Sequence, residues 1–147
     1  MGRLSIFALL FMIAALALAG CTEDESPEDM ARNDGKAFGE AVLAVFDVDS
    51  VAELREALLA VDEAEAALVA NFGPAERAQV EEIVDSVNAI LDDLRVAIDA
   101  DSDEVAREAA RSALAEIPSL ALSVAAITSD DSLVKAAVEG FIDGLGL

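Results

Sequence analysis

Few side chains in this sequence are suited to chemistry at neutral pH. The 147 residues include no histidine, tyrosine or tryptophan, and a single cysteine, Cys21. General base catalysis would therefore need a carboxylate with a raised pKa, and nucleophilic attack an unassisted hydroxyl or a carboxylate. A zinc, haem or copper site in this chain would lack the imidazole ligands, and all but one of the thiolate ligands, that such sites usually have. We expect a protein that is not an enzyme and has no cofactor.

Cys21 lies where an apolar segment meets an acidic one. Residues 1–20 have the three parts of an export signal: a basic residue, Arg3, then an apolar run over 4–19 broken only by Ser5, then small residues. This run is shorter than the ~20 apolar residues that span a bilayer as a helix. An export signal is therefore favoured over a permanent membrane helix.

The four residues Leu18-Ala19-Gly20-Cys21 resemble the lipobox of bacterial lipoproteins. Small side chains at Ala19 and Gly20 leave the backbone open to a peptidase, and a thiolate is a good nucleophile for taking up a lipid. The resemblance implies diacylglyceryl transfer to the Cys21 thiol, cleavage before Cys21, and acylation of the new amino terminus by a fatty acid such as palmitate. The alternative is an ordinary signal peptide followed by an incidental thiol.

The same resemblance implies an address for the protein. One acyl chain, at ~0.8 kcal/mol per buried methylene, binds a membrane marginally, whereas two or three chains anchor a protein stably. We therefore expect an exported, lipid-anchored protein of the cell envelope. In lipoproteins of enteric bacteria, an aspartate directly after the cysteine changes the membrane to which the protein is sorted. This sequence has Thr22 at that position. This implies the periplasmic face of the outer membrane in a Gram-negative cell, and otherwise the outer face of the cytoplasmic membrane.

Three segments follow from this interpretation: a signal peptide at 1–20, a lipidated tether at 21–25 and an acidic domain at 26–147. The full chain has 30 acidic and 9 basic residues and a net charge of −21. Removal of residues 1–20 takes away Arg3 and no acid, which leaves −22. Charge of this sign repels phosphate backbones and anionic head groups. Binding of nucleic acid and direct docking on anionic lipid are therefore excluded.

Three functions remain for the acidic domain. The first is a non-catalytic structural or interaction module that contacts an envelope protein. The second is an acidic binding module for cations or for a basic protein partner, although dense acids are also typical of proteins from salt-loving organisms, where salt screens their repulsion. The third is a carrier whose alanine-lined helices open around an apolar ligand.

One acidic segment has the spacing of a metal site. Asp99, Asp101 and Asp103 occupy the first three ligand positions of an EF-hand calcium loop. The sixth position holds Glu104 where the loop needs glycine, and the twelfth holds Ala110 where it needs a bidentate glutamate. A helix cap with solvated acids explains the same residues, and calcium binding is the alternative.

Apolar residues recur at helical spacing almost throughout 26–147, which predicts an all-α domain. Capping residues and prolines predict helix starts at Ser26, at Ser50 and at Pro74 or Ala75. Short connections favour antiparallel neighbours. The sequence therefore predicts an up-down antiparallel bundle of about four main helices, followed by short helices at the C-terminal end.

The second half of the domain gives a less regular pattern. A fourth helix is predicted over 103–117, with Asp101 at its cap. Its inward face is expected to hold Val105, Ala109, Ala113 and Leu114. Residues 119–127 are apolar nearly all round, which favours a buried segment, and a last helix is expected from about Ser132.

Two further features suggest contacts. Glycines spaced by four residues, which bring helix backbones together, occur in the first and last helices as Gly35-x-x-x-Gly39 and Gly140-x-x-x-Gly144. Close packing within the domain, or local fraying of the helices, is favoured over a dimer contact. The apolar C-terminal end is expected to meet a partner because such ends are normally covered. The residues predicted for this contact are Phe141, Leu145 and Leu147.

Overall fold

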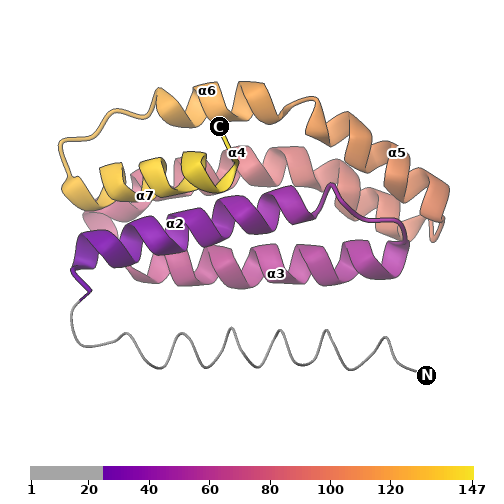
Figure 1. Cartoon of the computed structure of the whole chain (residues 1–147), viewed down its shortest axis with the longest axis horizontal. Coiled ribbons are helices and arrows are strands. Elements are labelled where there is room, and N and C mark those ends of the chain that lie inside the picture. Colours follow the sequence, from indigo (N-terminus) through magenta and orange to yellow (C-terminus); the bar gives the residue numbers. More distant parts are fainter. Residues whose placement is uncertain (1–24) are drawn as a thin grey trace.

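The computed structural model describes residues 25–147, which fold into helices with no β-strand among them (Figure 1). The predicted all-α bundle is confirmed. The described helices are α2 (Pro27–Ala44), α3 (Val51–Ala70), α4 (Pro74–Asp99), α5 (Asp103–Leu114), α6 (Ile117–Ala125) and α7 (Ser132–Gly144). None of them is both long enough and apolar enough to cross a membrane.

Local capping chemistry explains where the first helices begin. The Ser26 hydroxyl accepts from the Asp29 amide at 3.1 Å, and the Asp29 carboxylate accepts from the Ser26 amide at 3.4 Å, which completes a capping box before Pro27. Ser50 caps α3 by accepting from the Glu53 amide at 3.2 Å. The predicted starts of α2 and α3 are therefore confirmed.

The helices alternate in direction, with α5 and α6 together making one return path between α4 and α7 (Figure 1). α2 contacts α3 and α7, whereas α4 contacts α3, α5, α6 and α7. Because α2 and α7 are the first and last of five alternating passes, they run parallel. Two ion pairs show this register: Arg32 with Glu139 at 2.9 Å and, four residues further on both helices, Lys36 with Asp143 at 3.2 Å.

The core is a single apolar cluster that involves all six described helices. Its largest fully buried side chains include Phe38 of α2 and Phe141 of α7, whose ring centroids lie 5.4 Å apart. α4 contributes a continuous buried stripe, which consists of Val80, Ile83, Val84, Val87, Leu91, Leu94 and Ala97. No polar or charged residue of 25–147 is buried, so the acids all lie on the surface.

The prediction for α5 is wrong by about one residue. Ser102, not Asp101, is the N-cap, and its hydroxyl accepts from the Val105 amide at 3.5 Å. The buried residues of α5 are Ala106, Ala110 and Ala113. Val105 and Leu114 are 41% and 47% exposed. The charged residues of α5 mark its outer side, and the small alanines on the opposite side let α5 approach α4 closely.

The prediction that residues 119–127 are buried is also wrong. Pro118 lies in the first turn of α6, where its missing N–H costs nothing, so it restarts the helix. Only one face of α6 is buried, through Ile117, Leu120 and Val124. On the opposite face Leu122 is 74% exposed. α6 is therefore a surface helix with an apolar outer side.

Candidate functional site

Cys21 and the other lipobox residues lie outside the described residues, so lipidation stays a prediction. Residues 22–25 separate Cys21 from the Ser26 cap of α2. Even a fully extended tether of this length reaches less than ~20 Å. The end of the bundle at which α2 and α4 begin, called the tether end below, is therefore the end nearest Cys21. The α3–α4 turn belongs to it, since the side-chain Nδ2 of Asn71 donates to the Asp34 carboxylate of α2 at 2.6 Å.

The three aspartates of the predicted calcium segment have different surroundings. Asp99 is the last residue of α4, and the Asp101 carboxylate lies 3.9 Å from the Arg55 guanidinium. Asp103 accepts from the backbone amide of Val51 at 2.9 Å and so caps α3 from the start of α5. Across residues 25–147 no three such side chains come together in a way that could hold a metal ion. The three aspartates therefore lie where α4 ends and α5 begins, and they do not form a set of metal ligands.

The two glycine pairs meet each other across the α2–α7 contact. A Cβ atom placed on any of the four glycines would lie within 3.0 Å of a backbone atom of the opposite helix. Real Cβ atoms essentially never come that close, so each position requires glycine. The favoured prediction, close packing inside the domain, agrees with this geometry, and these glycines serve the fold.

The C-terminal contact residues are corrected by the structure. Phe141 is fully buried and Leu145 is 4% exposed, because α7 packs them into the core. Leu147 is 65% exposed. The prediction that Phe141 and Leu145 face a partner is therefore wrong: the apolar C-terminal end is covered by the chain's own helices.

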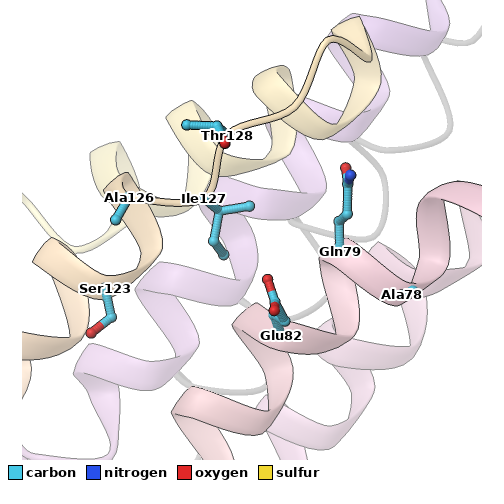
Figure 2. Close-up of a pocket in the computed structure, with 7 residues that line it drawn as sticks. All are labelled: Ala78, Gln79, Glu82, Ser123, Ala126, Ile127 and Thr128. Atoms are coloured by element: carbon cyan, nitrogen blue, oxygen red, sulfur yellow. The ribbon is translucent and has the colours of Figure 1, made fainter.

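A groove of about 500 Å³ lies between α4 and the segment that follows α6. Its lining residues are Ala78, Gln79, Glu82, Ser123, Ala126, Ile127 and Thr128. Figure 2 shows the side chains of Gln79 and Glu82 rising from α4 toward the 126–128 segment, with the Ile127 side chain between them and that segment. The groove therefore combines two polar side chains from α4 with both polar and apolar side chains from the other wall.

The polar side chains that line this groove make few hydrogen bonds within the described part of the chain. The Gln79 Oε1 atom is buried and has no hydrogen-bond partner in the described part of the chain. The Glu82 carboxylate takes part in none of the ion pairs or hydrogen bonds of residues 25–147. The Ser123 hydroxyl donates its hydrogen bond to the Ser119 carbonyl at 3.0 Å. Glu82 is exposed, so water solvates its carboxylate.

Sequence reasoning did not find this groove. Its walls come from segments some 40 residues apart, and only the fold brings them together. One signal was present in the sequence: Gln79 is the only glutamine of the chain, and it lies beside the buried stripe of α4.

A second groove, of about 350 Å³, lies between α3 and α4 and is lined by Arg55, Leu58, Leu59, Asp62, Arg95 and Ile98. Its basic groups are already engaged: Arg95 pairs with Asp62 at 3.4 Å and with Asp92 at 3.2 Å, and Arg55 lies near Asp101. The charged side chains of this groove therefore already have partners within the domain.

Comparisons with protein-family models, with curated proteins and with solved structures find no match to this chain.

Proposed function

We propose that this protein is a lipid-anchored lipoprotein of the cell envelope whose helical domain acts through non-covalent contacts and not through catalysis. The observation that carries the proposal is the run Leu18-Ala19-Gly20-Cys21, placed directly after an apolar segment and directly before an acidic domain. Two or three acyl chains on Cys21 would supply stable anchoring without help from the domain. In a Gram-negative cell the proposed site is the periplasmic face of the outer membrane, and otherwise the outer face of the cytoplasmic membrane.

The distribution of charge supports a non-catalytic role. A carboxylate becomes a general base at neutral pH mainly when burial or a like charge raises its pKa. No acidic residue of the described domain is buried. The acids instead cover the surface, where they repel anionic lipid and nucleic acid and attract cationic groups. The domain is therefore suited to contacts with a partner held close to the membrane.

A binding role for cationic groups is the second candidate, because no acidic residue of the described domain is buried and the acids on its surface attract cations. The carrier function has less support. The bundle interior is occupied by large apolar side chains such as Phe38 and Phe141, and the two grooves described above lie at the surface.

Replacement of Cys21 by serine tests the proposed function. The variant should move to the soluble fraction after cell lysis, because the lipid supplies the anchor. Thr22→Ser is the matched control, since it changes the next residue and keeps the thiol, and it should stay with the membrane. Intact mass of the native protein should show loss of residues 1–20 and addition of acyl groups. An unmodified Cys21, or a Cys21→Ser protein that remains on the membrane, would refute the proposal.

A further inference from the structure

The outer side of α6 carries no charge. Each of the other five described helices contains acidic and basic residues, whereas α6 contains neither, and the uncharged run extends over 117–129. In the whole chain 27% of the residues are charged. The exposed residues on the outer side of α6 and at its end are Pro118, Ser119, Leu122, Ala125 and Ala126. Ser119 is the only one of them with a polar side chain.

Leu122 differs in its neighbours from the other exposed apolar side chains. At 74% it is the most exposed large apolar side chain of residues 25–147. Residues three and four positions away share its side of the helix, and none of these is charged. Each of the other six exposed large apolar residues has a charged residue at such a distance. For Leu59 these positions hold Arg55, Glu56, Asp62 and Glu63. Charged groups keep water around Leu59, whereas no charge opposes the contact of Leu122 with an apolar surface.

α6 leads to the end of the bundle at which Cys21 is tethered. α7 follows α6 and runs parallel to α2, as the ion pair between Arg32 and Glu139 shows. The start of α7 and the segment that joins it to α6 therefore lie beside the start of α2, at the tether end (Figure 1). Because the tether reaches less than ~20 Å, a bilayer that holds lipid on Cys21 would lie close to this segment.

A second copy of the chain fits the outer side of α6 less well than a bilayer does. The helix has 9 residues. At 1.5 Å per residue and a diameter of about 10 Å, it covers on the order of 150 Å². A stable contact between proteins buries about 800 Å² on each partner, so it would extend onto acidic surface and set two chains of net charge −21 against each other. A lipid surface needs no such area, because a short tether raises the effective concentration to about millimolar and populates a weak contact.

We propose that the outer side of α6 rests on the neutral lipid surface in which Cys21 is anchored, with Leu122 at the interface. This inference rests on the proposed function, because the lipid on Cys21 supplies the bilayer. A carboxylate pressed against a bilayer would lose hydration, so the uncharged side of the bundle faces the lipid and the acidic sides face water. The contact of one short helix is too weak to hold the protein without acyl chains, which agrees with the release expected for Cys21→Ser.

The test uses the native lipidated protein in phosphatidylcholine liposomes, in which part of the lipid carries a nitroxide on its acyl chains. Since Cys21 is the only cysteine and its sulfur would be acylated, a cysteine introduced elsewhere can be labelled alone with a small fluorophore. Ala125→Cys places the label on the outer side of α6. Ala60→Cys places it at an exposed position of α3, on the opposite side of the bundle in Figure 1. The nitroxide lipid should quench the label at position 125 several-fold more than the label at position 60.

Two matched substitutions of exposed leucines, each made together with Ala125→Cys, make the test specific. Leu122→Gln should lower the equilibrium constant for contact with the bilayer by about tenfold, because a leucine side chain no longer enters the apolar layer. Leu59→Gln should leave this constant within about twofold. Both leucines are exposed, so both variants should keep the fold, which circular dichroism checks. Both should also stay on the liposomes, because the acyl chains hold them there.

Equal quenching at positions 125 and 60, or equal effects of Leu122→Gln and Leu59→Gln, would overturn the inference. A label at position 125 that is shielded only at a high ratio of protein to lipid, without quenching by nitroxide lipid, would assign this side to a second copy and would also overturn it.

Flotation of the liposomes and the intact mass of the protein separate this inference from the proposed function. A protein that carries acyl groups and floats, but whose label at position 125 is not quenched, would overturn the inference alone. A protein that carries no acyl group and does not float would overturn the proposed function, and this inference with it.

Discussion

The α-carbon of Gly140 in α7 lies directly against the backbone of Arg32 in α2: a methyl group added at Gly140 would meet the Arg32 carbonyl within 3.0 Å. The same relation joins Gly144 to the backbone of Lys36. Parallel neighbouring helices place like ends of their dipoles together, which is unfavourable. The ion pairs between them are largely exposed, and such pairs contribute ~0–1 kcal/mol each. Close backbone packing and the burial of apolar side chains such as Phe38 and Phe141 therefore hold the first and last helices together.

This contact predicts opposite effects for one substitution at two glycines. Gly140→Ser should lower the free energy of unfolding by about 1–3 kcal/mol, because the added atoms force α2 and α7 apart. Gly73→Ser should leave stability unchanged or raise it by a few tenths of a kcal/mol, because Gly73 is the N-cap of α4 and serine would complete a capping box with Glu76.

Urea unfolding followed by circular dichroism measures both effects. At Gly73 an added Cβ would meet only the Glu76 carboxylate, at 3.0 Å, and that side chain is free to move. A Gly140→Ser protein as stable as the unsubstituted one would show that α2 and α7 can separate without cost.

The sequence predicted best what local chemistry decides. The starts of α2, α3 and α4 depend on a serine or proline and its neighbours within one turn, and all three were predicted correctly. The buried stripe of α4 is also marked in the sequence, because Val, Ile and Leu recur there against acids and give a strong contrast.

The features decided by tertiary contacts were predicted poorly. The larger side chains Val105 and Leu114 suggested an inward face for α5, whereas the fold buries small alanines beside them. α6 contains no charged residue to mark its wet face, and its outer side could not be recognised. Phe141 was expected at a partner surface because nothing in the sequence shows that α2 covers it. The α4–α6 groove is likewise visible only in the folded chain.

The corrected orientation of α5 gives a second prediction. Ala110→Glu should destabilise the domain by several kcal/mol, because Ala110 is 2% exposed and a buried, unpaired carboxylate is costly. Leu114→Glu removes a larger apolar group but should cost less than about 1 kcal/mol, because Leu114 is 47% exposed. Thermal unfolding of the two variants decides between the orientations. If Leu114→Glu proved the more damaging change, the orientation first predicted from the sequence would be right.

Asp103 gives the third prediction, because it caps a helix to which it does not belong. Its carboxylate accepts from the amide of Val51, which is 5% exposed, so Asp103→Ala leaves a shielded N–H without a partner and should cost about 1 kcal/mol. Asp103→Asn keeps an acceptor oxygen and should recover part of the loss. Asp99→Ala is the matched control: a carboxylate at the C-terminal end of α4 opposes the helix dipole, so its removal should be neutral or slightly stabilising. Denaturant unfolding of the three variants measures these differences. Equal losses in Asp99→Ala and Asp103→Ala would contradict the capping role and would return these aspartates to a shared function.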